Sequence, residues 1–296
     1  MRTSRRGLRA AASSLYAGLP DERPGRAPHP CPPFAPSTKR AFRYLALGDS
    51  IVTGAVTYWS EIESYADYLY AHLRKYYAGK AEVHFDNLAR NGDGSRELLE
   101  RLDKDSKMAA AVRRADLITL CIGGNNLLRA AKIPGFTEID WDEAEKGVRQ
   151  FESDWPLLTN RIDALKRPGA VVIANTLYNP YDIHPPKGYE KDAGLNERAA
   201  PFIARINAAI GTTRRPGWRI ADVFTAFDRY ARTRMADVTH MYPPLIKYIL
   251  RNPHPTRRGQ LIIAELCIAA YEGIAIPDFG FFAVALENAT GEGAQA

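Results

Sequence analysis

The feature that most constrains the fold is the alternation, from Phe42 onward, of short apolar runs with longer amphipathic segments. Short apolar runs between turn residues predict buried strands, and a period near 3.6 residues predicts helices. Alternating strands and helices build a parallel sheet covered on both faces, so we predict a three-layer α/β sandwich with about five strands. We expect strands near residues 42–48, 82–88, 116–122, 170–175 and 218–224, and helices near 61–78, 95–114, 141–166, 194–213 and 256–272.

Composition divides the chain into three parts. Residues 1–40 are rich in Pro and Arg and poor in aliphatic side chains. Such a segment buries too little apolar surface to offset its ordering entropy, so we expect a disordered basic leader. Residues 41–275 form the expected single domain, and residues 276–296 form a C-terminal extension.

The formal net charge of +6 is concentrated at one end of the chain. Residues 1–43 hold nine Arg or Lys against Asp21 and Glu22, so the remainder is close to neutral. A basic leader does not make the basic face that nucleic-acid binding needs, and we expect no nucleic-acid partner. The sequence does not indicate an oligomeric state.

Neither end of the chain predicts a membrane segment. The apolar region from Leu261 to Leu286 is interrupted by acidic residues and Pro277, so we expect no stable membrane insertion. Residues 1–20 lack the continuous apolar stretch of a signal peptide, which favours a cytoplasmic protein. Secretion stays open if the true start lies elsewhere.

The cysteines and glycine loops do not predict a cofactor site. Cys31, Cys121 and Cys267 are far apart in the sequence and form no Cys-x-x-Cys or Cys/His cluster, so we expect no metal and no disulfide framework. A nucleotide or phosphate binder of this fold class would carry GxxxxGK[ST] or GxGxxG, and neither occurs. We expect no organic cofactor.

Polar or Gly-rich loops follow four of the expected strands. Ligands of parallel sheets bind beyond the carboxyl ends of the strands. The first such loop places Ser50 where a buried strand breaks at Gly48, which suits an exposed nucleophile on a rigid element. The simpler interpretation is that Asp49 or Ser50 only caps the following segment.

Three further residues supply what a serine nucleophile needs. His254 lies between two prolines just before an amphipathic helix and is a candidate base. Gly92 and Asn125 follow the second and third strands and offer a backbone N–H and a side-chain amide to an oxyanion. Taken singly, each also fits a surface or turn residue.

Together these residues resemble the SGNH or GDSL hydrolase family, in its lipase-like and acylesterase-like branch. Four blocks occur in the family's order over about residues 42–272: ALGDSIVTG, NLARNGDGS, ITLCIGGNNLL and NPHPTRRGQLIIAEL. The softer matches are VVIANTLYNPYD, LNERAAPFIARINAAI and WRIADVFTAF. The resemblance implies a flavodoxin-like fold and a serine esterase or lipase-type acyl hydrolase acting on a small-molecule, lipid or carbohydrate ester.

The resemblance also implies roles for residues. Ser50 is the expected nucleophile, with its own N–H and the groups of Gly92 and Asn125 as oxyanion donors, and His254 is the expected base. The neighbouring Asp49, Gly123 and Asn126 are expected to bind substrate.

Two positions depart from the family pattern. Arg251 stands where members usually carry the Asp that orients the catalytic His, and Asn126 replaces an Asp that usually holds its loop. The His254 ring then takes its orientation from Asn252, from a backbone carbonyl or from the more distant Asp237. Arg251 also keeps a second function open, a non-catalytic protein of this fold that binds an acylated or carbohydrate ligand.

Overall fold

The structure is a computed structural model that describes residues 41–57, 60–132, 135–213, 215–243 and 251–274. The expected leader, residues 1–40, and the expected extension, residues 276–296, lie outside the described residues. The described part contains the whole predicted sheet and the helices around it.

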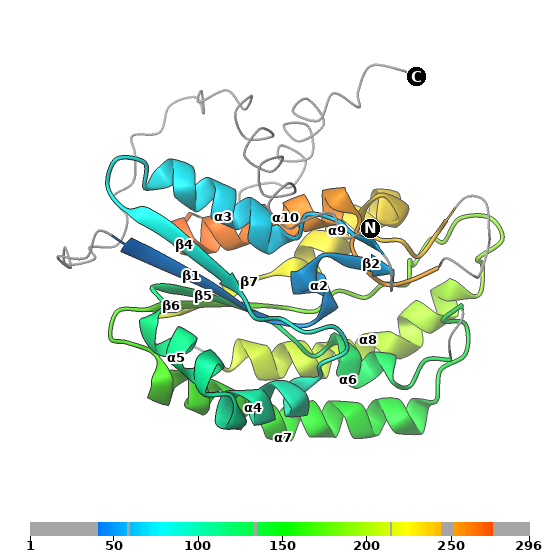
Figure 1. Ribbon diagram of the computed structural model, residues 1–296. Coiled ribbons are helices and arrows are strands. Elements are labelled where there is room, and N and C mark those ends of the chain that lie inside the picture. The colour runs from blue at the N-terminus through cyan, green and yellow to red at the C-terminus, as the bar shows by residue number, and fades with distance from the viewer. Residues whose placement is uncertain (1–40, 58–59, 133–134, 214, 244–250, 275–296) are drawn as a thin grey trace, which may run out of the picture.

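A five-stranded parallel sheet in the order β4-β1-β5-β6-β7 forms the centre, which confirms the predicted fold class (Figure 1). Because β1 lies between β4 and β5, the chain reverses direction across the sheet at β1. At this switch point the carboxyl ends of neighbouring strands open a crevice. The strands are β1 (Ala41–Gly48), β4 (Glu82–Asn87), β5 (Leu117–Cys121), β6 (Val171–Asn175) and β7 (Trp218–Ala221).

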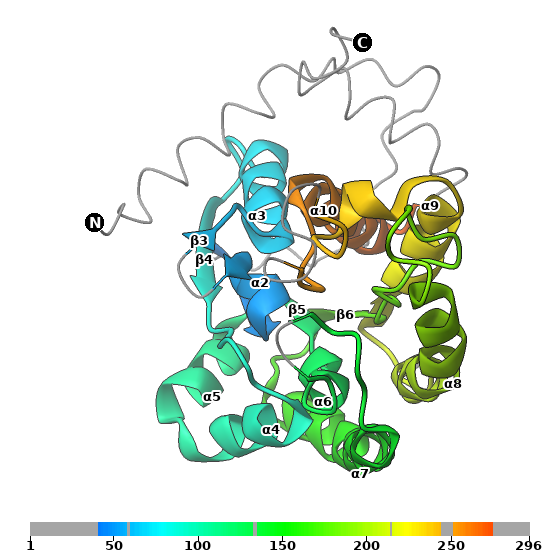
Figure 2. The same ribbon diagram turned by 90° about the vertical axis from the view of Figure 1, so that its right-hand side faces the viewer.

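Helices cover both faces of the sheet (Figures 1 and 2). Side chains of β1 alternate between the faces, so Tyr44 and Ala46 join one core cluster and Leu45 and Leu47 the other. One face carries α3 (Tyr65–Tyr76), α9 (Val223–Val238) and α10 (Arg257–Glu272); the other carries α4 (Ser95–Lys104), α5 (Ser106–Arg114), α7 (Trp141–Leu165) and α8 (Asp192–Gly211). Short elements follow β1 and β5: α2 (Ser50–Thr53), the antiparallel pair β2 (Ala55–Thr57) and β3 (Ser60–Glu61), and α6 (Gly124–Leu128).

The structure corrects two predicted boundaries. The single helix expected over residues 95–114 is two helices, because the Asp105 carboxylate caps α5 by accepting the N–H groups of Lys107 and Met108. The strand expected over residues 218–224 ends at Ala221, and α9 follows it.

Helix α9 was missed because Val223 and Phe224 are good strand formers and extend the apolar run of β7. Asp222 was the available signal. Its carboxylate accepts the N–H of Thr225, as expected of a residue that begins a helix.

Helix α7 lies close against α6, and Gly147 makes this approach possible. A Cβ added at Gly147 would lie 1.8 Å from the backbone oxygen of Asn126. The Asn126 side chain also donates to the Gly147 oxygen at 3.3 Å. The position of α6, and of Asn125 on it, therefore depends on a residue without a side chain in α7.

Gly147→Ala tests this packing. Helix propensity alone predicts that Ala stabilises α7 by about 1 kcal/mol. The blocked approach predicts the opposite, a loss of roughly 1–3 kcal/mol in the free energy of unfolding. Urea unfolding measures the sign. Gly194→Ala in α8, where an added Cβ meets nothing within 4 Å, is the control and should be neutral or stabilising. Stabilisation by both substitutions would contradict the close packing of α6 on α7.

Candidate active site

Ser50 is the first residue of α2, immediately beyond the end of β1. Gly48 has a φ of +142°, and a Cβ there would lie 1.9 Å from the Cys121 oxygen, so only glycine lets β1 end this close to β5. Asp49 then accepts the N–H of Ile51 at 3.0 Å and caps α2. The sequence thus fixes Ser50 in a tight turn, where 8% of the residue remains exposed.

Asp49 is buried next to Ser50, and its carboxyl has an unusual pKa. Burial raises the pKa to about 7, with a smaller contribution from the charge of Asp93, against the hydrogen bond from Ile51. A folded-state pKa above the unfolded one means that stability from this group is present at low pH and is lost as the pH rises through 7.

His254 forms the contact that organises the site. Its Nε2 lies 2.8 Å from Ser50 Oγ, although the two residues are 204 positions apart in the chain. Its Nδ1 lies 3.0 Å from Asn252 Oδ1. The structure therefore brings together the predicted nucleophile, the predicted base and one of the predicted orienting residues.

The hydrogen bonds to Asn252 determine which ring nitrogen of His254 carries the proton. The backbone N–H of His254 donates to the same Asn252 atom at 3.0 Å, so that atom must be the carbonyl oxygen of the amide. An oxygen acceptor facing Nδ1 requires the proton on Nδ1. Nε2 is then left unprotonated and accepts a hydrogen bond from the Ser50 hydroxyl.

The alternative orienting residue, Asp237, has other partners. Its carboxylate lies 3.8 Å from Nη1 of Arg258, and its backbone oxygen accepts the Thr256 hydroxyl at 2.5 Å. Both ring nitrogens of His254 are engaged by Ser50 and Asn252. The structure therefore favours Asn252 over Asp237 at this position.

Burial keeps His254 neutral. It lowers the pKa of His254 to about 4, and the nearby His240 contributes to the same direction. Among the described residues, no carboxylate forms a hydrogen bond or ion pair with the ring that would oppose this effect. The imidazole is therefore unprotonated, as a base must be, well below neutral pH.

The backbone holds the His254 segment in place. The N–H of His240 donates to the oxygen of His254 at 3.0 Å, and the N–H of Asn252 donates to the oxygen of His240 at 3.1 Å. Tyr178 adds a hydrogen bond of 2.5 Å from its hydroxyl to the oxygen of Pro253. These bonds explain how a Pro-flanked loop presents its histidine in one orientation.

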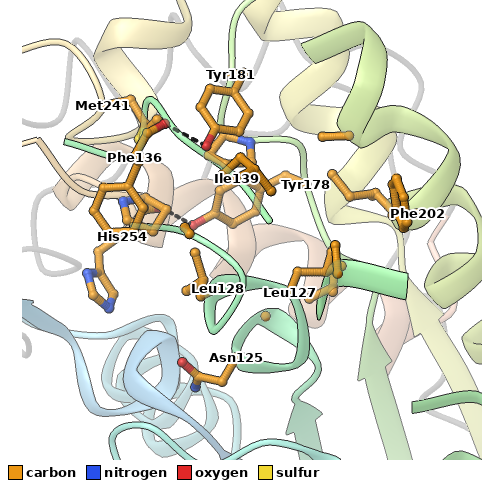
Figure 3. A pocket seen from close by; sticks show the side chains of 18 of the residues that line it. Asn125, Leu127, Leu128, Phe136, Ile139, Tyr178, Tyr181, Phe202, Met241 and His254 are labelled. Carbon is orange, nitrogen blue, oxygen red and sulfur yellow. Dashed lines mark hydrogen bonds between the residues drawn. The ribbon is translucent and has the colours of Figure 1, made fainter. Parts of the chain in front are cut away.

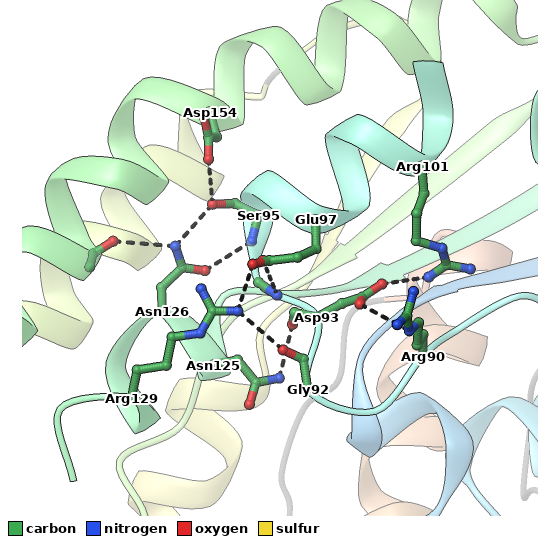
Figure 4. A network of polar contacts seen from close by, with 12 residues as sticks. Arg90, Gly92, Asp93, Ser95, Glu97, Arg101, Asn125, Asn126, Arg129 and Asp154 are labelled. Carbon is green, nitrogen blue, oxygen red and sulfur yellow. Dashed lines mark hydrogen bonds and ion pairs between the residues drawn. The ribbon is translucent and has the colours of Figure 1, made fainter. Parts of the chain in front are cut away.

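The two expected oxyanion donors, Gly92 in the loop before α4 and Asn125 on α6, are connected by a polar network (Figure 4). Asn125 donates one amide hydrogen to the Asp93 oxygen at 2.9 Å, and that bond needs only one of its two hydrogens. Gly92 has a φ of +83°, and an added Cβ there would meet nothing within 4 Å. Arg129 donates to the Gly92 oxygen at 3.3 Å.

Asn126 and Gly123 shape the loop behind Asn125 and are not among the residues lining the pocket described below. Asn126 Oδ1 accepts the Ser95 N–H at 3.0 Å, and its amide donates to Ser95 Oγ at 2.9 Å. A Cβ on Gly123 would lie 2.7 Å from the Phe151 ring. Of the three residues predicted to bind substrate, Asp49 lines the pocket and the other two do not. Their contact with a substrate stays a prediction.

A pocket opens at Ser50 and His254 (Figure 3). The long segment after β6 provides one wall. The sequence reasoning missed the opposite wall, between α6 and the start of α7, although apolar residues outside any predicted element were a signal. The apolar lining comprises Ile51, Leu127, Leu128, Ala131, Phe136, Ile139, Trp141, Ala144, Leu177, Tyr178, Pro180, Tyr181, Ala199, Phe202, Ile203, Met241 and Pro253.

The family model of GDSL-like lipases and acylhydrolases matches residues 46–262. The chain belongs to this GDSL-like family. Its members are ester-cleaving hydrolases, so this chain is a hydrolase acting on ester bonds. Comparison with curated proteins finds no match.

Solved structures with low sequence identity share the fold. The lipase Lip_vut3 from a goat rumen metagenome is 20% identical with a TM-score of 0.59, covering 78% of this chain and 98% of its own. The extracellular lipase of Streptomyces rimosus is 18% identical with a TM-score of 0.54 over 77% of this chain and 99% of its own. The acetylxylan esterase Axe2 of Geobacillus stearothermophilus is 15% identical with a TM-score of 0.52 over 78% and 94%.

For the residues that the structure describes, two findings concern membrane insertion and metal binding. Within it, no helix is both long and apolar enough to cross a membrane. Nor do three His, Cys, Asp or Glu side chains gather there in a group that could hold a metal ion.

Arg251, which departs from the GDSL pattern, is buried and forms an ion pair with a carboxylate. Its guanidinium pairs with the Asp192 carboxylate at the start of α8, and only 3% of the residue is exposed. Three tyrosine rings surround the guanidinium at 5.2–5.8 Å from its central carbon: Tyr181, Tyr189 and Tyr242. Arg251 therefore joins the segment that carries His254 to the wall of the pocket.

Arg251→Met tests how much this buried ion pair contributes to stability. It leaves the Asp192 carboxyl buried without its cation, and we expect a loss of about 3–5 kcal/mol in the free energy of unfolding, measured in urea. The control is Lys104→Met, which breaks the exposed pair with Glu100 and should cost less than about 1 kcal/mol. Equal effects of the two substitutions would contradict a stabilising role for the buried pair.

Proposed function

We propose that this chain is a serine esterase or lipase-type acyl hydrolase that cleaves a carboxylic ester through an acyl-enzyme on Ser50, with His254 as the base. The observation that carries the proposal is the contact of 2.8 Å between Ser50 Oγ and His254 Nε2, with Asn252 behind the ring. A hydroxyl needs such a base to become a nucleophile. This contact lies at the mouth of an apolar pocket in an ester-cleaving family.

The proposed reaction has two halves. Ser50 Oγ attacks the carbonyl carbon while His254 Nε2 takes the hydroxyl proton. The carbonyl oxygen becomes an oxyanion that accepts hydrogen bonds from the N–H of Ser50, the N–H of Gly92 and the amide of Asn125. The C–O bond to the alcohol breaks, and the alcohol leaves with the proton from His254. Water then attacks the acyl-enzyme with His254 as base, and the acid and Ser50 are released.

Asn252 has a defined part in this mechanism. Its oxygen accepts a hydrogen bond from the Nδ1–H group and so keeps Nε2 facing Ser50, as the carboxylate does in a Ser-His-Asp triad. A neutral amide orients the ring but adds no negative charge to stabilise the imidazolium. Asn252 is therefore a positioning residue.

Ester hydrolysis by single-site variants tests the nucleophile and the base. Ser50→Ala and His254→Ala should each lower kcat on p-nitrophenyl butyrate by about 10⁴-fold or more, because the two groups act as a unit. A fluorophosphonate probe should label the wild type at Ser50 and leave Ser50→Ala unlabelled.

The same labelling separates catalysis from the non-catalytic alternative. The alternative, which rests on Arg251 in place of the usual Asp, predicts no labelling and no turnover. Full turnover by Ser50→Ala would instead place the nucleophile elsewhere.

Asn252→Asp should move the acid limb of the pH profile. In the wild type, kcat/KM should fall only near pH 4, where His254 becomes protonated and can no longer act as a base. A carboxylate beside Nδ1 favours the protonated ring and should raise the pKa by about one to three units. The acid limb then shifts to higher pH by the same amount, which a kcat/KM profile from pH 3.5 to 9 measures.

Asp49 needs a control because its pKa of about 7 falls in the same range. Repeating the comparison in an Asp49→Asn background removes this titration. The shift caused by Asn252→Asp should persist there. An acid limb that stays in place in both backgrounds would remove Asn252 from the position beside the His254 ring.

A further inference from the structure

The composition of the pocket limits what it can bind. Among the described residues that line it, all except Asp49, Ser50, Asn125 and His254 are apolar or aromatic, or are the backbone of Gly124. These four polar residues belong to one end, at the reacting serine. The remainder offers a ligand mainly carbon surface.

The two tyrosines in the lining do not change this conclusion, because their hydroxyl groups are already used. Tyr178 donates to the oxygen of Pro253 at 2.5 Å, and Tyr181 donates to the oxygen of Phe136 at 2.8 Å. Figure 3 shows both bonds at the pocket wall. Burial also raises the pKa of Tyr181 and of Tyr178. Both residues therefore present their rings to the cavity, and a sugar ring there would lose hydrogen bonds to water without replacement.

The apolar part of the pocket extends to one side of His254. Figure 3 places Phe202 on the opposite side of the cavity from His254, with Leu127 and Leu128 between them. At the far side the Phe202 ring stacks on Trp141, with ring centres 5.6 Å apart, and the guanidinium of Arg198 lies 4.4 Å from the Trp141 ring centre. The apolar surface therefore extends away from the base.

The direction in which the apolar surface extends indicates which half of an ester, the acyl chain or the alcohol, would occupy it. The leaving oxygen must lie near His254 to receive the proton, and the carbonyl oxygen must point toward Asn125. The remaining substituent of the carbonyl carbon, the acyl chain, then points away from His254. An acyl chain in this orientation would lie along Leu127 and Leu128 toward Phe202.

We propose that this pocket is an acyl-chain site and that the substrate is an ester of a medium- or long-chain fatty acid rather than an acetate. The inference rests on the proposed function, since it takes Ser50 as the nucleophile. Trp141 and Phe202 are the residues that limit chain length. Ala199 on α8 also lines the pocket and limits the width of the space available to the chain.

The first measurement varies the acyl chain with the alcohol held constant. For p-nitrophenyl acetate, butyrate, octanoate and decanoate, kcat/KM should rise by up to about fourfold for each methylene that enters the pocket. Alkyl acetates with lengthened alcohols should show no comparable rise. A preference for acetate, or a rise that follows the alcohol instead, would overturn the proposal.

The second measurement uses a substitution that narrows the pocket. Ala199→Phe should lower the ratio of octanoate to acetate kcat/KM by about tenfold or more, because one phenyl group displaces several methylenes of the chain. Ala204→Phe is the matched control, on the exposed side of α8 and absent from the lining, and it should leave the ratio unchanged. An unchanged ratio in Ala199→Phe, with thermal unfolding like that of the wild type, would place the acyl chain elsewhere.

The failure of this inference is distinguishable from failure of the proposed function. Loss of acetate hydrolysis in Ser50→Ala together with an acetate preference of the wild type would keep the serine mechanism and reject the acyl-chain site. No labelling of Ser50 by a fluorophosphonate and no hydrolysis of any chain length would reject both.

Discussion

The site depends on the close approach of the carboxyl end of β1 to that of β5. At Gly48 the backbone passes so near to the Cys121 oxygen that no side chain fits, and the Asp49 N–H donates to that same oxygen at 3.2 Å. One strand end then leads into Ser50 and the other into Asn125. A second close approach, of Gly147 to the Asn126 backbone, fixes α6 from behind. Two glycines in different elements thus set the spacing between Ser50, the proposed nucleophile, and Asn125, a proposed oxyanion donor.

Arg251 stands where GDSL proteins usually carry the acidic residue of the triad. Here it forms a buried ion pair instead. Arg251 carries a positive charge, which would disfavour the imidazolium if it faced His254. It lies instead in a cage of aromatic rings with its own carboxylate partner, Asp192. Orientation of the ring passes to Asn252, one residue further along the chain. Of the two roles that one Asp combines elsewhere, ring orientation and charge stabilisation, Asn252 can supply only the first.

Much of the fold could be predicted from the sequence because its signals are local. Apolar runs placed all five strands of the sheet, and four short blocks placed Ser50, Gly92, Asn125 and His254. The missed features depend on tertiary contacts. The pairing of Arg251 with Asp192 joins residues 59 positions apart and leaves no local pattern. The hydrogen bonds between Asn126 and Ser95 likewise join residues 31 positions apart, so no local pattern identifies Ser95 as the partner.

The apolar pocket and the unusual titration of the site have one physical origin. Burial disfavours charge, so it lowers the pKa of His254 to about 4 and raises that of Asp49 to about 7. A base with a low pKa is a weak base, which by itself slows proton transfer. The same scarcity of water strengthens each hydrogen bond to an oxyanion. An acyl chain filling the pocket would exclude further water from Ser50, so chain length would act on kcat as well as on binding.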